Sequence, residues 1–184
     1  AIRRRDVDLC VWRRGFDTPF ASWCQHLTHG LQLDVDGVVM NDGRWPVERW
    51  LSSMPACEHR ARLAADVRAR LTHYGQLFGP RRMRVQLHCV HEQTCPRFHV
   101  DNVGVRLICT WAGPGTEWIP ERELDRTRLR ELPLDELPRH HLERFDVALM
   151  KGAAWAGNAH RGVVHRSPGV SEVPRLVFTV DGKA

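Results

Sequence analysis

The sequence has little lysine, no Cys-x-x-Cys pair and no long apolar run, and the last two of these features rule out particular kinds of protein. Only two of the 27 Lys and Arg residues are lysines, Lys151 and Lys183. No stretch approaches the roughly 18 consecutive apolar residues that a membrane-spanning helix needs, so we expect no membrane partner. The charged start, residues 1–8, lacks the apolar segment of a secretion signal. These features predict a cytoplasmic protein.

The six cysteines follow no spacing that is typical of a metal-binding or redox motif. They stand at Cys10, Cys24, Cys57, Cys89, Cys95 and Cys109. Without a Cys-x-x-Cys pair, zinc ribbons and thioredoxin-like chemistry are excluded. An even count permits three disulfides, but the spacing is irregular and a chain of 184 residues can build its own core. We therefore expect reduced thiols, most of them buried.

The formal net charge is +5, which would suit an anionic partner. The arginines, however, are scattered among acidic residues, and local runs such as Arg3–Arg5 and the pair Arg81 and Arg82 are short. Nucleic-acid binding usually needs a clustered basic surface that neutralises phosphates. A solvated, arginine-rich surface is therefore the preferred interpretation, and we do not expect a nucleic-acid partner.

The length predicts one domain over residues 1–184, with a helical N-terminal layer over residues 1–80. A helix is expected to begin at Thr18, before a proline, and a short one at Pro46. The strongest helical pattern follows Pro55 and ends at Gly79. Its apolar residues recur at steps of three and four, at Leu63, Val67, Leu71, Tyr74 and Phe78.

Residues 81–184 change to the period of strands. Apolar residues alternate with polar ones at Met83, Val85, Leu87 and Cys89. Further short strands are expected over residues 98–101, 105–111, 117–119, 145–150, 162–166 and 175–181, separated by Gly and Pro turns. Residues 120–141 are expected to form a long surface loop. The result is an α+β fold in which the helices pack outside a β-sandwich or barrel.

Metal-ligating side chains are densest between His88 and Asp101. One interpretation relates His91-Glu92-Gln93-Thr94-Cys95 to the zinc-protease helix motif, but Cys replaces the second His and a proline follows. A second uses a structural zinc site made of Cys89, His91, Cys95 and His99. Its spacing matches no common zinc finger, and the alternation of a strand would separate the ligands. Neither interpretation is favoured.

The third interpretation uses His99 and Asp101 alone. On a strand, residues i and i+2 point to the same face, so this pair presents an imidazole beside a carboxylate. A second histidine would complete a facial triad for Fe(II), and His165 stands on an expected strand 64 residues after Asp101. Arg175 follows ten residues later, where a guanidinium is able to bind a dicarboxylate. The competing interpretation makes His99 and Asp101 a hydrogen-bonded pair and His165 a core residue.

This order of residues resembles the Fe(II)/2-oxoglutarate-dependent dioxygenase superfamily, in its prolyl-hydroxylase-like branch, over roughly residues 83–181. The segments Arg106-Leu107-Ile108-Cys109-Thr110-Trp111 and Gly113-Pro114-Gly115-Thr116 are similar to that branch's following strand and turn. The resemblance implies a double-stranded β-helix, a jelly-roll or cupin-like fold, over residues 81–184. The whole chain also resembles a bacterial family of uncharacterised proteins.

The resemblance further implies a catalytic Fe(II) held by His99, Asp101 and His165, with Arg175 binding 2-oxoglutarate as cosubstrate. Oxidation of a small-molecule or protein substrate by dioxygen would then yield succinate and CO2. Many members place Ser two residues after the Arg, whereas this chain has Val177. The expected substitutes for that serine are Thr179, Thr110 and Arg106.

Two alternatives belong to other classes of protein. The same jelly-roll scaffold, holding zinc, would serve as a non-catalytic metal-handling or sensing protein, with Cys95 near the rim of the site or buried in packing. The second is a haloacid-dehalogenase-type phosphatase that uses Asp34 and Asp36, because Leu33-Asp34-Val35-Asp36-Gly37-Val38 resembles its first motif. The expected supporting motifs and parallel sheet are missing, so a hairpin turn at Asp36-Gly37 is preferred.

Overall fold

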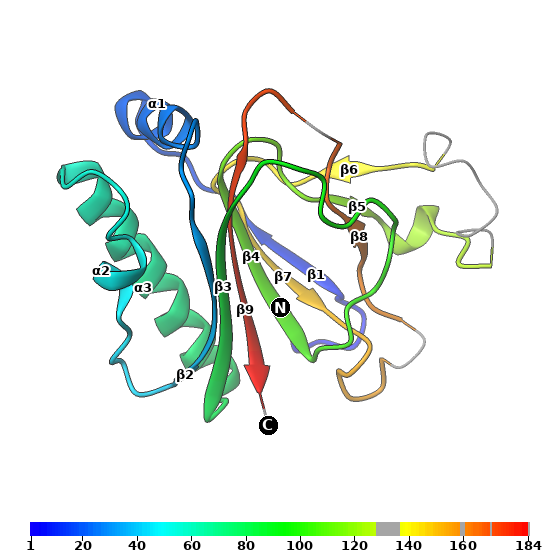
Figure 1. The fold of residues 1–184 in the computed structure, drawn as a ribbon. Helices are drawn as coiled ribbons and strands as arrows, with labels where there is room; N and C mark the ends of the chain where they lie inside the picture. Colours follow the sequence, from blue (N-terminus) through cyan, green and yellow to red (C-terminus); the bar gives the residue numbers. More distant parts are fainter. Residues whose placement is uncertain (128–136, 159–160, 170, 184) are drawn as a thin grey trace.

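The computed structural model describes residues 1–127, 137–158, 161–169 and 171–183, which form two antiparallel sheets and a group of helices (Figure 1). The larger sheet has six strands in the order β1-β7-β4-β9-β3-β2, and the smaller has the order β6-β5-β8. The larger sheet contains β1 (Leu9–Trp12), β2 (Asp34–Met40), β3 (Arg82–Val90), β4 (Val105–Ala112), β7 (Val147–Lys151) and β9 (Arg175–Lys183). The smaller contains β5 (Glu117–Ile119), β6 (His140–His141) and β8 (Val164–Arg166).

The helices begin and end at local signals in the sequence. Helix α1 (Thr18–Leu27) is capped by Asp17, whose side chain accepts a hydrogen bond from the backbone N–H of Phe20 at 3.0 Å. Helix α2 (Val47–Trp50) follows Pro46, and α3 (Glu58–Phe78) ends at Gly79. Gly79 has a φ of 62°, the left-handed conformation that glycine adopts at low cost.

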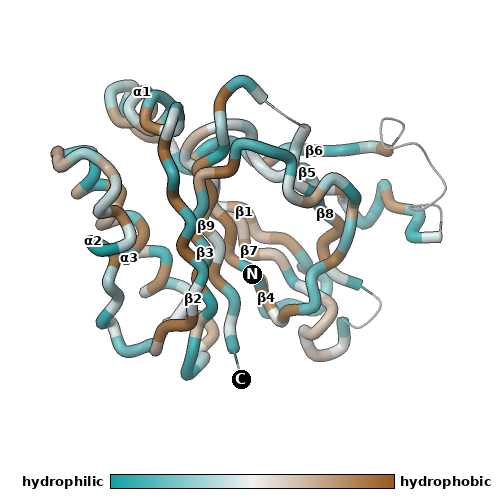
Figure 2. Tube along the Cα trace, in the orientation of Figure 1, coloured by the Kyte–Doolittle hydropathy of each residue, from teal (hydrophilic) through white to brown (hydrophobic). Residues whose placement is uncertain are grey.

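The helices cover one face of the larger sheet, and the smaller sheet lies beside the other face (Figure 1). Alternation along β9 separates the two sides: Phe178 joins the core beneath the helices, while Val177 joins a second core toward the smaller sheet. In β4, Leu107 likewise belongs to the core beneath the helices and Ile108 to the second core. Figure 2 shows hydrophobic residues in these strands and in α3. The two faces therefore have different chemical environments.

Two strands from the first half correct the expectation of a helical layer over residues 1–80. Strands β1 and β2 form the two edges of the larger sheet, where they pair antiparallel with β7 and β3. The expected hairpin turn at Asp36-Gly37 is wrong, because both residues lie inside β2 and pair with Gln86 and Val85. Pairing along seven residues has overridden the local preference of an Asp-Gly dipeptide for turns.

The second half differs from expectation at two places. Residues 98–101 do not form a strand, and only His99 makes an isolated bridge, to His165. The expected loop over residues 120–141 contains a short 3-10 helix at Glu121–Glu123 and strand β6, while residues 128–136 of it lie outside the described part of the chain.

All six cysteines are free, as expected, but only Cys24 and Cys109 are buried, so the expectation that most are buried is wrong. Within the described ranges, no helix is both long enough and apolar enough to cross a bilayer. The pairing of a larger with a smaller antiparallel sheet is compatible with a jelly-roll.

Candidate metal centre

His99 and His165 face each other across the isolated bridge. Each backbone N–H donates to the other residue's carbonyl at 3.0 Å, which is the pairing of directly opposed residues on antiparallel strands. Side chains at such positions leave the same face, and the two imidazole rings lie 4.7 Å apart between centroids. The bridge therefore brings together two histidines that are far apart in the sequence.

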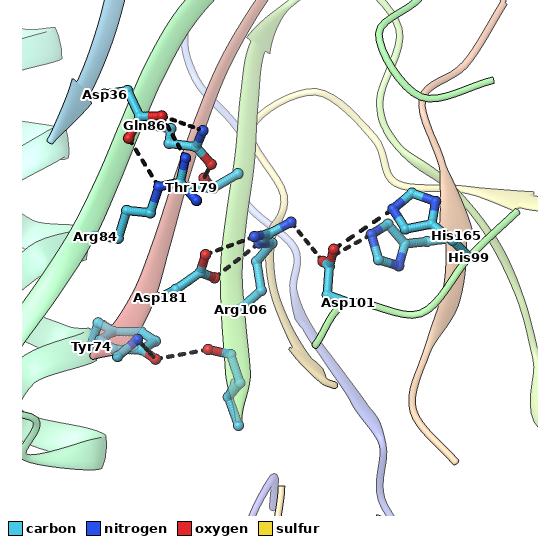
Figure 3. Close-up of polar contacts among 12 residues, drawn as sticks. Asp36, Tyr74, Arg84, Gln86, His99, Asp101, Arg106, His165, Thr179 and Asp181 are labelled. Carbon is cyan, nitrogen blue, oxygen red and sulfur yellow. Dashed lines mark hydrogen bonds and ion pairs between the residues drawn. The ribbon is translucent and has the colours of Figure 1, made fainter. Parts of the chain in front are cut away.

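Asp101 completes the cluster, two residues after His99. One carboxylate oxygen, Oδ1, lies 3.6 Å from Nε2 of His99, and the other, Oδ2, lies 3.2 Å from Nε2 of His165. One ligand atom from each of the three residues lies within 4.8 Å of the other two. Figure 3 shows both rings directed at the carboxylate. The structure thus brings together the three residues that the sequence nominated as ligands.

Backbone carbonyls orient both imidazoles. Nδ1 of His99 lies 2.9 Å from the carbonyl oxygen of Arg97, and Nδ1 of His165 lies 3.0 Å from that of Val163. Because a carbonyl only accepts, each Nδ1 carries the proton and donates it. In the neutral ring, this leaves the lone pair on Nε2, on the side that faces Asp101. Such an outer contact is the usual means of fixing a metal-binding histidine.

Asp101 is held from behind by Arg106, on β4. Nη1 of Arg106 donates to Oδ2 of Asp101 at 2.6 Å, while its Nε and Nη2 donate to Asp181, on β9, at 2.9 and 2.6 Å (Figure 3). Burial opposes ionisation of Asp101, but hydrogen bonds from the two imidazoles in their protonated form, in which Nε2 also carries a proton, and the charge of Arg106 outweigh burial and lower the pKa of Asp101. The carboxylate is therefore ionised and oriented.

These contacts give Arg106 a different role from the one expected. Its three hydrogen bonds to two carboxylates occupy the guanidinium fork, so it is not available as a substitute for the serine that binds the cosubstrate. Thr110 does not fit that role either, since it is buried and does not line the cavity described below. Thr179 does line that cavity, and its hydroxyl donates to Oε1 of Gln86 at 3.3 Å.

Arg175, at the start of β9, is buried and has only neutral partners among the described residues. It donates to the carbonyl of Pro114 at 2.9 Å, to the hydroxyl of Thr116 at 3.1 Å and to that of Ser167 at 3.4 Å. Burial lowers the pKa of Arg175 to about 10, far enough above neutrality for it to stay charged. A buried guanidinium without a carboxylate is suited to an anionic ligand.

One cavity of about 720 Å³ extends from the two histidines of the triad to this arginine. Its walls include His99, His165, Arg175, Val177 and Thr179. Sequence reasoning missed Thr116 and Ser167 as contacts of Arg175, although the turn containing Thr116 was noted in the resemblance. Their hydroxyls position the guanidinium from the turn before β5 and from the end of β8.

The other nominated metal sites do not form. Within the part of the chain that the structure describes, His99, Asp101 and His165 are the only group of three that lies close enough for one ion, so the zinc sites built on Cys89, His91 and Cys95 are wrong. The expected helix for the protease-like motif is absent, because residues 91–95 are not helical. Cys95 is exposed and lines the cavity of the triad, which excludes buried packing.

The phosphatase interpretation is also wrong. That chemistry needs a nucleophilic aspartate at the end of a strand in a parallel sheet, whereas β2 is an antiparallel edge strand. Asp34 contacts His88 at 2.6 Å, and Asp36 accepts hydrogen bonds from Arg84 and Gln86 (Figure 3). The two carboxylates therefore serve the contacts between β2 and β3.

No curated protein matches the chain in sequence. Among solved structures, it is similar to the rice dioxygenase for auxin oxidation, with 13% identity, a TM-score of 0.47 and coverage of 97% of this chain and 74% of that one. It is also similar to a Pseudomonas putida prolyl-4-hydroxylase, with 10% identity, a TM-score of 0.47 and coverage of 96% of this chain and 93% of that one. A third similar structure is the Arabidopsis thaliana dioxygenase for auxin oxidation 1, solved with 2-oxoglutarate. Its identity is 11% and its TM-score 0.43, with coverage of 82% of this chain and 63% of that one. All three TM-scores lie below 0.5, so the chemical assignment depends on the site itself.

A protein family described as "Protein of unknown function (DUF1826)" matches residues 1–181. The expected membership of a family of uncharacterised proteins is thereby confirmed. Because the match extends over almost the whole chain, the protein belongs to the DUF1826 family.

Proposed function

We propose that the protein is an Fe(II)- and 2-oxoglutarate-dependent oxygenase of the hydroxylase type, with dioxygen as co-reactant and a small molecule or a protein as substrate. One observation carries the proposal. The ligand atoms of His99, Asp101 and His165 lie close enough together to hold one ion, and both histidines line a cavity that also contains Arg175, a buried guanidinium with no carboxylate partner among the described residues. We infer further that the two sheets form a double-stranded β-helix.

The donor set fits Fe(II). Two imidazoles and one carboxylate from one side of an ion form the facial triad, which leaves positions open for a cosubstrate and dioxygen. His99 and His165 present Nε2, and Asp101 presents Oδ1, because Arg106 binds its other oxygen. When bound, Fe(II) supplies the redox chemistry that couples oxidation of the substrate to decarboxylation of 2-oxoglutarate.

The chain's own residues position the cosubstrate. Arg175 pairs with the carboxylate distant from the metal through charge-assisted hydrogen bonds, which are stronger than neutral ones. Thr116 and Ser167 hold the guanidinium in place, and Thr179 offers a hydroxyl on the same cavity wall. Ile108 and Val177 line the cavity as well, and their apolar side chains reduce the access of water.

The test is anaerobic addition of Fe(II) to metal-free protein, with and without 2-oxoglutarate, followed by visible spectroscopy. We expect a charge-transfer band that needs both additions, is lost in His99→Ala and persists in His26→Ala, an exposed histidine of α1. Arg175→Met is expected to weaken 2-oxoglutarate and spare the metal. Tight zinc binding without any effect of 2-oxoglutarate would overturn the oxygenase and favour a metal-handling protein.

A further inference from the structure

A second cavity, of about 420 Å³, lies between β1 and α3 and shares no residue with the cavity of the triad. Its floor is the helix-side face of the larger sheet, at Leu107 and Leu149. One wall is β1, with Trp12, and the other is α3, with Arg70 and Leu77. The volume falls within the range of small-molecule sites, and most of the lining is apolar.

Arg70 lines this cavity and lacks partners for most of its guanidinium. The residue is 4% exposed, and within the described chain neither Nε nor Nη1 has a hydrogen-bond partner. Its remaining nitrogen, Nη2, lies 3.4 Å from Oδ1 of Asp66. Buried donors are almost always satisfied, so these two N–H groups require an explanation.

Asp66 does not balance the charge of Arg70, because the negative charge of Asp66 is already paired with Arg14. Arg14 binds both oxygens of Asp66, at 2.6 and 3.1 Å, and the indole Nε1 of Trp111 donates to it at 2.8 Å. Two buried guanidiniums therefore share one carboxylate, which leaves one positive charge in excess. A buried charge in excess is costly unless an opposite charge joins it.

Trp12 covers the guanidinium without satisfying it. The zeta carbon of Arg70 lies 4.8 Å from the centroid of a Trp12 ring, a cation–π contact that provides no oxygen acceptor for the free N–H groups. The indole is 52% exposed and stands on β1, an edge strand. Rotation of this side chain would expose more of the Arg70 guanidinium to the cavity that it lines.

We propose that this cavity, the Arg70 cavity, binds a small amphipathic anion. The apolar chain or ring of the ligand packs on Leu107 and Leu149. The carboxylate of the ligand, or a similar monoanionic group, pairs with Arg70 when the side chain of Trp12 rotates away from it. The excess positive charge selects an anion, and the apolar floor selects a ligand with a hydrophobic part. The site is independent of the proposed oxygenase chemistry.

Octanoate and its neutral counterpart 1-octanol test the proposal, with binding followed by calorimetry and by tryptophan fluorescence. We expect octanoate to bind at least tenfold more tightly than 1-octanol. Arg70→Met is expected to weaken octanoate at least tenfold and to leave 1-octanol unchanged. Arg68→Met is the matched control, since Arg68 is on the same helix but pairs with Glu48.

Two further variants keep the test decisive. Leu77 is 43% exposed at the rim, so Leu77→Glu retains the fold and is expected to weaken octanoate by repulsion, even if Arg70→Met does not fold. Arg175→Met is expected to leave octanoate binding intact. The proposal would be overturned by equal affinity for octanoate and 1-octanol, or by the absence of saturable octanoate binding. It would also be overturned if octanoate binding were lost in Arg175→Met but retained in Leu77→Glu.

Discussion

Two charge clusters lie on opposite faces of the larger sheet. On one face, the guanidinium of Arg106 binds the carboxylates of Asp101 and Asp181. On the other face, the carboxylate of Asp66 binds the guanidiniums of Arg14 and Arg70. The clusters are built from the same two residue types, and β4 contacts both of them. Their net charges, however, are opposite.

The opposite net charges indicate which kind of ligand would neutralise each cluster. A buried ion pair compensates its own desolvation only when its charges and hydrogen bonds are matched. The Asp101 cluster carries one negative charge in excess beside two histidines, which suits a divalent cation. The Asp66 cluster carries one positive charge in excess beside an apolar cavity, which suits an anion with a hydrophobic part. Substitutions that alter the charge of either cluster therefore test this difference.

The largest effect is expected for Arg14. Arg14→Met removes both short hydrogen bonds to Asp66 and leaves that carboxylate only the 3.4 Å contact with Arg70, so we expect a loss approaching the about 3–5 kcal/mol that breaking a buried pair costs. Arg70→Met removes only the excess charge and is expected to change the free energy of unfolding by less than about 1 kcal/mol. Urea denaturation of both variants measures the difference. Equal losses would mean that the two arginines stabilise Asp66 equally, which would contradict the assignment of the excess charge to Arg70.

On the other face, Asp101→Asn is expected to weaken metal binding by at least about 100-fold, more than the loss of an outer-shell contact. The substitution removes the only anionic ligand of the triad and keeps the size of the side chain. Titration of metal-free protein with Fe(II) or Co(II) measures the affinity. Asp36→Asn is the control, since Asp36 also pairs with an arginine but lies outside the triad. Unchanged affinity in Asp101→Asn would contradict the assignment.

A smaller effect is expected for Arg106, about tenfold in metal affinity, because it orients Asp101 without being a ligand. Arg106→Gln also leaves Asp181 buried and unpaired, so the double variant with Asp181→Asn is needed to restore stability. We expect the double variant to recover the free energy of unfolding and not the metal affinity. Recovery of both would make Arg106 a purely structural residue.

The pairing of His99 with Asp101 was predictable because its geometry is local. The i,i+2 spacing places His99 and Asp101 on one side of an extended segment, and an expected strand contained His165. The inference succeeded even though residues 98–101 form no regular strand, since a single bridge to His165 fixes the same orientation. Short-range spacing therefore nominated His99 and Asp101, whereas His165 was nominated by its place on an expected strand and by the resemblance.

The role of Arg106 was not predictable, because its partner Asp181 is 75 residues away in the sequence and meets it only through the pairing of β4 with β9. The edge strands β1 and β2 were missed for a related reason. Their pairing partners lie far along the chain, and β2 contains a dipeptide that favours turns. Local patterns identify candidates, whereas tertiary pairing decides what each one contacts.

The smallest expected effect concerns thiol reactivity on the two faces. Cys109 lies 3.3 Å from Nη2 of Arg14, and a nearby positive charge favours a thiolate. Burial has the larger influence and raises the pKa of Cys109 to about 12. Cys95, on the cavity of the triad, is exposed. Iodoacetamide at pH 8 is therefore expected to modify Cys95 and to leave Cys109 intact until the protein unfolds.

Mass spectrometry of digested peptides checks this labelling, and a rise in pH sharpens it. Between pH 8 and about 9.5, Cys109 stays protonated because its pKa remains well above this range, so its labelling is not expected to increase. Unfolded protein, in which Cys109 has its ordinary pKa, is the positive control. Rapid labelling of Cys109 in the folded protein would mean that the excess positive charge near Arg14 and Arg70 stabilises an anion even in the packed core. A charge in excess would then be satisfied from within the chain, and the Arg70 cavity would not need an anionic ligand.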